Sequence, residues 1–284
     1  MNRRYCGKTF AKKELDEICG IVRNNPQEHR VSLSKIVCEA LNWRKPDGGL
    51  KEMSCRVAML RMEKDGLLKL PPPRKRNGNG KKSKRRTLLA APRSSFTIKS
   101  LGDLRATIVG TRASSLLWNE YIDRYHYLSF SPLPGAQLRY FIKVGSEVVA
   151  LLGFGASAWK VAPRDKWIGW RPDQRERNLH LVINNARFLI LPWVTRKNLA
   201  SKILSLITKR ISGDWHKRYN YRPVLLETFV EIGRFYGTIY KASNWANVGV
   251  TQGRGKLGSH CAKVPTKSIW LYPLLKSFRK ELIK

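Results

Sequence analysis

In residues 1–70, apolar and polar positions alternate with the period of an α-helix, which predicts three helices, the last ending near Gly66. The apolar positions are Leu15, Ile18, Cys19 and Val22, then Leu33, Ile36, Val37, Ala40 and Leu41, then Leu50, Met53, Val57 and Leu60. Ser32 is a candidate N-cap for the second helix. A short apolar run, Leu67–Leu70, predicts a strand after the helices. Three helices followed by a strand favour a small winged helix-turn-helix domain.

From residue 95 onward, strand-like apolar runs alternate with helical patterns. A hairpin is expected at Gly145-Ser146, which separates two such runs. The expected strands are Arg139–Val144, Glu147–Gly155, Val182–Leu191, Val224–Val230, Asn247–Thr251 and Lys267–Tyr272, and the expected helices are Asn198–Ile211 and Gly233–Ala242. This order predicts an α/β domain with a mixed sheet over residues 95–284.

Between these two parts, residues 71–94 follow neither pattern. The stretch Pro71–Arg86 combines three prolines, two Asn-Gly pairs and eight Lys or Arg residues. Such a composition cannot bury a core and favours a flexible, basic linker.

The charge points to a polyanionic partner. Lys and Arg number 55 against 20 Asp and Glu, a formal net charge of +35. Such an excess of like charges destabilises a folded domain by mutual repulsion. Binding to a polyanion compensates for this cost, because it releases the counterions condensed on the polyanion. DNA is the favoured partner, with an RNA scaffold or an anionic membrane surface as alternatives. The membrane is the weaker one, because no apolar run approaches the roughly 20 residues of a spanning helix. The chain opens without a signal-peptide core, so a cytoplasmic protein is expected.

The cysteines and acidic residues do not indicate a metal centre. Five cysteines are widely spaced and none forms a CxxC pair. The acidic residues form no DxD or ExK cluster of the kind a metal-dependent nuclease uses. We therefore expect no metal and no cofactor.

Basic and aromatic side chains are the candidate DNA contacts. The third helix is expected to present Lys51, Arg56 and Arg61 to a major groove, unless this domain is a helical protein-interaction module. The linker contributes Arg74, Lys75, Arg76, Lys81, Lys82, Lys84, Arg85 and Arg86. In the larger domain, Trp170, Arg196 and Lys197 suit base stacking and phosphate contacts, and Arg254 lies in a glycine-rich basic turn. The alternative for the tryptophans is partial burial in a twisted sheet.

Several longer motifs resemble the family of the A protein of the Druantia anti-phage system. They are Leu41–Arg44, Leu70–Arg74, Tyr125–Leu128, Pro134–Tyr140, Ala162–Trp170, Asn184–Val194, Leu225–Val230 and Thr251–Gly255. The resemblance runs over nearly the whole chain. It implies a bacterial defence or transposon-associated role beside other subunits, among them a helicase.

A looser resemblance concerns the fold of the larger domain. Leu191–Leu204 is similar to the strand, phosphate loop and helix of GNAT-type acyltransferases, which implies a GNAT-like fold. Asn198 and Ala200 stand where that loop has glycines, which argues against close approach of a CoA pyrophosphate. Ile239–Trp245 looks like the segment that carries the general-acid tyrosine of that superfamily, here Tyr240. His126-Tyr127 and the hairpin after them look like Mom-type DNA-modification proteins.

If the protein is an enzyme, its catalytic residues are expected among Tyr125, His126, Tyr127, Glu227 and Tyr240. Glu227 ends an apolar strand and is a candidate base, or else the partner of an arginine. The imidazole and phenols are candidate acids and bases, or else packing groups. We expect these residues to meet in one crevice, where the positive field lowers the pKa of a phenol.

The sequence thus predicts a DNA-binding component of an anti-phage or transposon-associated system. The alternative is a nucleic-acid-modifying or -cleaving enzyme with a GNAT-like crevice. A third hypothesis is an adaptor that docks a helicase.

Overall fold

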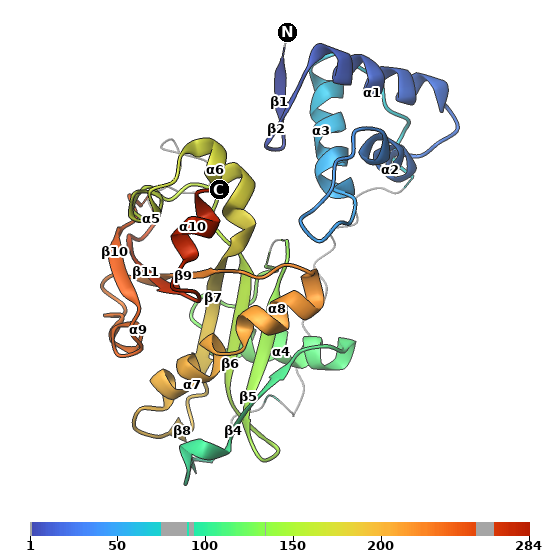
Figure 1. Ribbon diagram of the computed structural model, residues 1–284. Coiled ribbons are helices and arrows are strands. Elements are labelled where there is room, and N and C mark those ends of the chain that lie inside the picture. The colour runs from blue at the N-terminus through green and yellow to red at the C-terminus, as the bar shows by residue number, and fades with distance from the viewer. Residues whose placement is uncertain (1, 75–89, 91–93, 134, 254–263) are drawn as a thin grey trace. The chain divides into compact units, whose positions relative to one another are not determined.

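A computed structural model describes residues 2–74, 90, 94–133, 135–253 and 264–284 (Figure 1). The chain divides into two compact units, Met1–Lys84 and Arg85–Lys284. The division falls inside the segment 71–94, and most of the predicted linker lies outside the described residues. The two units are therefore described separately.

The first unit opens with a β-hairpin that sequence reasoning missed. Strands β1 (Arg3–Tyr5) and β2 (Lys8–Phe10) pair in antiparallel fashion. They are joined by Cys6 and Gly7, whose φ angles of 49° and 81° are both positive. Two consecutive positive φ angles are typical of the tight turns that match the twist of a hairpin.

Three helices follow as predicted: α1 (Lys12–Asn24), α2 (Arg30–Ala40) and α3 (Glu52–Lys64). Helix α1 buries Leu15, Ile18 and Val22, as its spacing indicates. The N-cap of α2 is His29 rather than Ser32, because the His29 imidazole accepts a hydrogen bond from the Ser32 amide.

Helix α3 turns a different face to the core from the one predicted. Its buried residues are Cys55, Ala58, Met59 and Met62. The predicted core positions Met53, Val57 and Leu60 are 66%, 38% and 42% exposed. Both sets have helical spacing, so periodicity alone cannot decide which one is buried.

The predicted strand at Leu67–Leu70 is wrong. This segment is irregular, although Leu70 is buried and its amide donates to the Glu63 carboxylate over 2.7 Å. The two strands of this unit precede the helices instead of following them. The winged arrangement is thus not confirmed.

The second unit is built on a mixed sheet of seven strands in its described residues, in the order β10-β11-β9-β7-β6-β5-β4. The sheet strands are β4 (Leu104–Ile108), β5 (Leu138–Val144), β6 (Glu147–Ala156), β7 (Val182–Ile190), β9 (Leu225–Glu231), β10 (Ala246–Val250) and β11 (Lys267–Pro273). A separate small pair is formed by β3 (Phe96–Thr97) and β8 (Val194–Thr195). The helices are α4 (Arg112–Tyr125), α5 (Ala162–Ile168), α6 (Pro172–Asn178), α7 (Leu199–Thr208), α8 (Ile211–Tyr219), α9 (Thr238–Lys241) and α10 (Phe278–Leu282).

The predicted α/β class with a mixed sheet is confirmed. All neighbours in the sheet are antiparallel except β7 and β9, which run parallel. The hairpin at Gly145 is confirmed, and this glycine has a φ of 57°. The helix expected over Asn198–Ile211 is confirmed as α7, which ends at Thr208, and sequence reasoning missed α8, which begins at Ile211.

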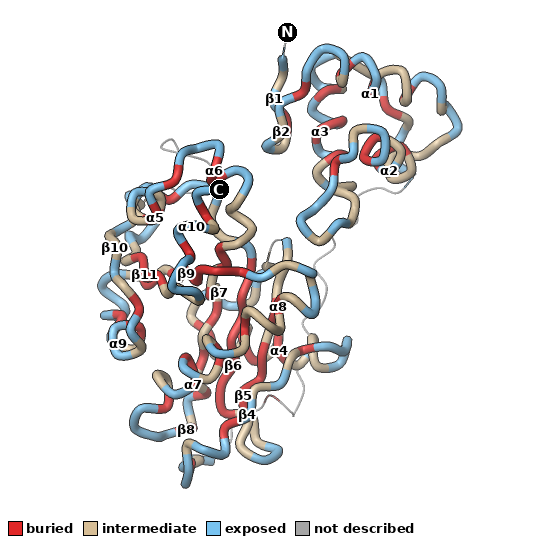
Figure 2. Tube along the Cα trace, viewed as in Figure 1, coloured by how far each residue is buried: buried red, intermediate tan, exposed pale blue. Residues whose placement is uncertain are grey.

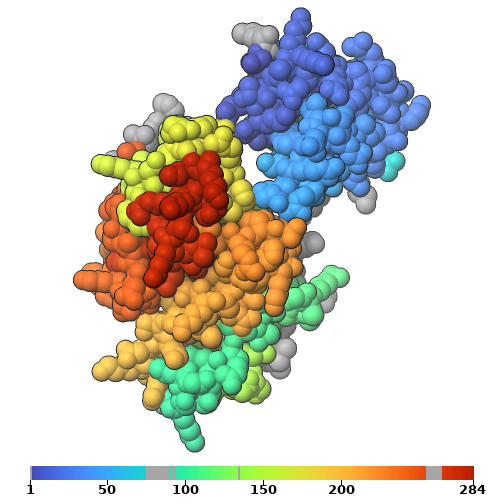
Figure 3. Space-filling model, in the orientation of Figure 1, coloured from blue at the N-terminus to red at the C-terminus, as the bar shows by residue number. Residues whose placement is uncertain are grey.

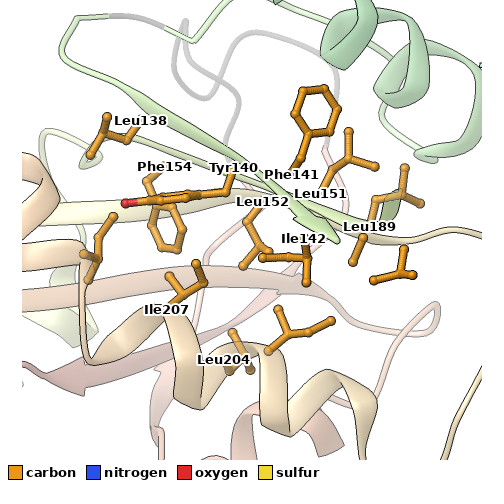
Figure 4. Packing of buried hydrophobic residues seen from close by; sticks show 14 of the residues in the cluster. Leu138, Tyr140, Phe141, Ile142, Leu151, Leu152, Phe154, Leu189, Leu204 and Ile207 are labelled. Carbon is orange, nitrogen blue, oxygen red and sulfur yellow. The ribbon is translucent and has the colours of Figure 1, made fainter. Parts of the chain in front are cut away.

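Helices cover both faces of the sheet. Leu204 and Ile207 of α7 point to the face that carries Tyr140 and Phe154, and the Phe141 side chain lies on the opposite face (Figure 4). That opposite face is covered by α4, whose Trp118 is buried. The central strands are accordingly the most continuously buried part of the unit (Figure 2).

The C-terminal helix closes the second unit at one end. Helix α10 packs beside α6, and Figure 3 shows these segments in red and yellow. The side chains of Gln174 and Asn178 donate hydrogen bonds to the carbonyls of Ile283 and Leu282. The last turn of the chain is therefore tied to α6.

Strands β7 and β9 stay together over a short distance only. Their parallel register joins Val182–Asn184 to Leu225–Glu227, and beyond Asn184 and Glu227 no further pair forms between them. The sheet thus opens into a wedge, bordered by the rest of β7 on one side and the rest of β9 on the other. We refer to this opening as the β7–β9 wedge.

A bulge in β7 changes the direction of its side chains next to the wedge. Asn185 lies opposite Phe154, whereas Arg187 lies opposite Gly153, so one residue of β7 is extra at this point. Neighbouring residues of β6 face opposite sides of the sheet, and directly paired residues share a side. Asn185 therefore faces the α7 side, and Arg187 faces α4, where its Cβ lies close to Gly153 and Trp118.

Candidate functional site

On the α7 side, three polar residues meet at the β7–β9 wedge. The Thr228 hydroxyl donates to the Asn185 carbonyl over 3.0 Å and lies 3.4 Å from the Tyr240 hydroxyl. Asn185 is 4% exposed, and both polar atoms of its side-chain amide lack a partner within the described residues. A buried amide without a partner is unusual, so the wedge holds polar capacity that the described fold leaves unused.

Burial raises the pKa of Tyr240 to about 12, while its hydrogen bond with Thr228 works in the opposite direction. The phenol is consequently protonated at neutral pH and able to donate a proton. The expected lowering of a phenol pKa by the positive field does not occur at Tyr240, where desolvation is the largest effect.

On the α4 side, a second group of side chains lies beside the wedge. We call it the aromatic–arginine cluster and define it as His126, Tyr127, Arg187, Arg234 and Phe235. The rings of His126 and Tyr127 stack with centroids 4.8 Å apart. The Arg234 guanidinium lies 4.6 Å from the Tyr127 ring, and the Phe235 ring meets Tyr127 edge-on at 5.1 Å.

The electrostatics of this cluster are dominated by its two arginines. Burial, then Arg187 and Arg234, lower the pKa of His126 to about 4, so the imidazole is neutral at pH 7. Burial raises the pKa of Tyr127, and Glu231 adds to this effect while both arginines oppose it. Tyr127 in turn raises the pKa of Tyr240, which places the two phenols within electrostatic reach of each other at the wedge.

Glu227 lies away from these groups. Because Glu227 and Thr228 are neighbours on β9, their side chains face opposite sides of the sheet. One Glu227 carboxylate oxygen accepts a hydrogen bond from the Ala158 amide, and the other accepts one from the Arg164 guanidinium, each over 2.8 Å. Glu227 therefore does not lie beside Tyr240. Its partner is an arginine, Arg164, which is the alternative given in the sequence analysis.

Tyr125 is also separate from the cluster. Its hydroxyl donates to the Ala90 carbonyl over 2.7 Å, and its ring packs edge-on against Trp193 at 5.1 Å. Of the five predicted catalytic residues, the structure therefore gathers His126, Tyr127 and Tyr240 near the wedge.

The candidate DNA contacts of the first unit are partly at the surface. Arg61 and Arg74 are exposed, whereas Lys51 and Arg56 are half-buried. The guanidinium of Arg56 is held by the Met53 sulfur and its Nε has no partner within the described residues.

In the second unit, Arg196 and Lys197 are exposed just before α7. Trp170, in contrast, is buried, and its indole N–H donates to Asp165, so it does not present its ring for base stacking. The remaining predicted contacts lie outside the described residues: Lys75, Arg76, Lys81, Lys82, Lys84, Arg85, Arg86 and Arg254.

Sequence reasoning missed the arginines of the cluster. The signal that the sequence offers for Arg187 is a charged residue within an apolar strand. The structure buries this residue, and charged side chains are rarely buried without a partner. Arg234 is followed by Phe235 and Tyr236, an exposed basic-aromatic run of the type that contacts nucleic acid.

Asn198 adopts a left-handed conformation with φ of 61° and caps α7 with its backbone alone. Its backbone thus takes a form that glycine prefers, at the position where the resemblance expects glycine. Among the described residues no group of three or more His, Cys, Asp or Glu side chains is gathered as for a metal ion. No described helix combines the length and apolarity needed to cross a membrane.

Comparison with known proteins gives a family match. The model of the family described as Druantia protein DruA matches residues 61–265. No curated protein matches the chain. The association with transposases and the likeness to Mom-type proteins stay predictions.

The chain is also similar to solved acetyltransferases. One is the ribosomal-protein-S18-alanine N-acetyltransferase from Escherichia coli, with 12% identity, 60% of this chain and 94% of that chain covered, and a TM-score of 0.37. Another is the spermidine/spermine N-acetyltransferase from Vibrio cholerae, with 9% identity, coverage of 63% and 98%, and a TM-score of 0.40. At these values the likeness says nothing about activity.

Proposed function

Because this chain belongs to the Druantia protein DruA family, we propose that it serves as a DNA-binding component of the Druantia anti-phage defence system. In this role it works beside other subunits of the system, a helicase among them, on DNA in the cytoplasm.

The observation that carries the proposal is the positive charge left over by the fold. Even if each of the 20 acidic residues neutralised one basic residue, a net charge of +35 would remain. Several acids are already engaged within the fold: Asp165 serves both Arg164 and Arg175, and Asp214 serves Arg210. The excess is therefore available to an external polyanion.

Exposed basic side chains occur on both units. Described examples are Lys12, Lys13, Arg23, Arg61, Lys64, Arg196 and Lys197. Contacts of such side chains with phosphates release counterions, which makes binding steeply dependent on salt but nearly independent of sequence. Binding of this kind suits a defence protein that must engage DNA of many phages.

The test is a salt series with the full-length protein and a fluorescently labelled duplex of about 20 base pairs. We expect tight binding at low salt and a linear fall of log affinity with log salt, by about 0.9 for each phosphate contacted. Poly-glutamate is the control competitor, since it offers negative charge without the spacing of a phosphate backbone. Absence of binding at low salt, or competition by poly-glutamate at equal charge, would contradict the proposal.

A nucleic-acid-modifying enzyme is the second candidate. It is favoured by the protonated Tyr240 phenol at the β7–β9 wedge, where the Asn185 side-chain amide has no partner among the described residues. A phenol of this kind can serve as a general acid. The variant Tyr240→Phe keeps the ring and removes the proton. If the chain acts as an enzyme, this variant retains DNA affinity and loses protection against phage, while an unchanged level of protection argues for binding alone.

A further inference from the structure

The aromatic–arginine cluster holds two arginines, and Glu231 is the one acid whose charge is felt there among the described residues. Neither Arg187 nor Arg234 forms an ion pair within the described part of the chain. Arg187 is 9% exposed and donates only to neutral groups, the Ala186 carbonyl at 2.7 Å and the Ser131 hydroxyl at 2.8 Å. Its Nε is buried and has no partner among the described residues.

A buried guanidinium without a counterion is costly, because desolvation of the charge is not repaid by an opposite charge. The neighbouring imidazole does not relieve this, since His126 is neutral and accepts the Leu128 amide. The acid that acts on the cluster is Glu231, whose charge is felt at Tyr127. The site is therefore electrostatically complementary to an anion.

The surroundings of the cluster are aromatic and open to solvent. Phe235 is 46% exposed and Tyr236 is 92% exposed. Ile232 and Leu128 are 47% and 41% exposed. Arg234 lies over the rings of both Tyr127 and Phe235, at 4.6 and 5.8 Å, so charge and ring faces are presented together.

Flat rings combined with unpaired arginines match one class of ligand particularly well. A nucleotide offers a base that stacks on an aromatic face and a phosphate that pairs with a guanidinium. In a duplex the base faces are already stacked on each other, so only an unpaired nucleotide can use the rings. The side-chain oxygen of Asn184 is buried and has no described partner, which adds an acceptor on β7, the strand that carries Arg187.

We propose that the aromatic–arginine cluster binds an unstacked nucleotide of single-stranded DNA. The base stacks against the exposed ring of Phe235, whose position is fixed by its edge-on contact with Tyr127, and Arg234 holds the adjoining phosphate. Arg187 supplies positive charge from within the fold and is a positioning residue for this contact. The inference rests on the proposed DNA binding and names the site that distinguishes single strands from duplexes.

The experiment compares three labelled probes of equal length on the full-length protein: a single strand, the same strand with abasic sites, and a blunt duplex. The test variant is Arg234→Ala with Phe235→Ala, both at exposed positions. The matched control is Trp159→Ala with Lys160→Ala, which removes one exposed ring and one exposed charge elsewhere in the same unit. Circular dichroism melting establishes that all variants are folded.

We expect the test variant to bind the single strand at least about tenfold more weakly and the duplex about twofold more weakly, in line with the usual effect of one stacked base. The control binds both probes only slightly more weakly, and to the same extent. Wild-type protein binds the abasic strand more weakly than the intact strand, but more tightly than the variant binds the intact strand, because Arg234 still contacts a phosphate.

Two results overturn the inference while leaving DNA binding in place: equal weakening on single strand and duplex, or unchanged affinity of wild-type protein for the abasic strand. The second result would show that the site holds a phosphate alone. Failure of wild-type protein to bind any of the three probes would instead overturn the proposed function.

Discussion

Arg164 and Glu227 form an ion pair 2.8 Å long in which both side chains are fully buried. The pair joins helix α5 to strand β9, and Arg164 also reaches Asp165 and the Ala158 carbonyl. Burial raises the pKa of Glu227, and the adjacent guanidinium opposes this effect. The carboxylate thus holds two elements together, which differs from the role of a catalytic base.

This pair predicts a large decrease in stability when one member is removed. Glu227→Gln removes the fully buried charge partner of Arg164 and leaves Asp165 as its remaining ion-pair partner, which costs up to about 3 kcal/mol in the free energy of unfolding. Chemical denaturation measures this change. The control is Asp173→Asn at the exposed pair with Arg171, where we expect little or no change in stability, because solvent screens both charges. Equal effects at the two sites would contradict the structural role of Glu227.

A pH effect is predicted at His126. Its pKa falls from 6.5 to about 4 in the folded protein, so the unfolded chain takes up a proton that the fold rejects. The stability that the neutral imidazole contributes is present above about pH 6.5 and is lost as the pH falls toward 4, by up to about 3 kcal/mol.

Denaturation between about pH 7 and pH 4, the range set by the two pKa values, measures this decrease, with His126→Asn as the comparison. Asparagine keeps an acceptor for the Leu128 amide but does not titrate in this range. The difference in unfolding free energy between wild type and variant should therefore shrink as the pH falls. A difference that is constant over the whole range would show that His126 does not carry the effect.

Gly237 is predicted to tolerate no side chain. Its φ is 70°, and an added Cβ would lie 2.7 Å from the Trp270 indole. Gly237→Ala should cost roughly 1–3 kcal/mol, since both backbone strain and overpacking act at one position. Thermal unfolding measures it, and Gly233→Ala is the control, because Gly233 has a φ of 85° but open space around the Cβ position. A similar destabilisation in both variants would assign the effect to the backbone alone.

The segment between Arg74 and Arg86 is predicted to contribute a large share of the DNA affinity. Replacing its eight basic residues with serine should weaken binding to all DNA sequences alike. It should also flatten the plot of log affinity against log salt by about 0.7–0.9 for each phosphate that the variant no longer neutralises. A salt titration by fluorescence anisotropy provides the measurement, and an unchanged slope would contradict the contribution of this segment.

The sequence allows the sheet strands β5, β6, β7, β9, β10 and β11 of the second unit to be predicted, because a buried sheet leaves long apolar runs, but β4 and the helices α4, α5, α6, α8 and α10 are not among the predicted elements. It does not allow the orientation of α3 to be predicted, because Met53, Val57 and Leu60 repeat with the same spacing as Cys55, Met59 and Met62. Which stripe is buried depends on α1 and α2, and thus on tertiary packing.

The candidate site shows the same limit. His126 and Tyr127 can be identified from their chemistry, and Tyr240 from a resemblance. Arg187 depends on the bulge opposite Gly153, which turns it toward α4, and a bulge leaves no periodic trace in the sequence. From the sequence, Glu227 is placed on the wrong side of β9 for a related reason. The alternation of side chains along a strand determines which residues share a face, but it does not determine which of the two faces lies toward the wedge.

The β7–β9 wedge also increases the number of strand edges in the sheet. A continuous sheet has two edge strands, whereas here the part of β7 after Asn184 and the part of β9 after Glu227 each have a neighbour on one side only. Unpaired strand edges promote aggregation when another protein can reach them. These two inner edges face each other across the wedge. One β7 carbonyl, that of Asn185, accepts a hydrogen bond from the Thr228 hydroxyl. Among the described strands, the fold thereby has two additional strand edges that face each other, and the outer borders at which a second molecule could pair remain β10 and β4.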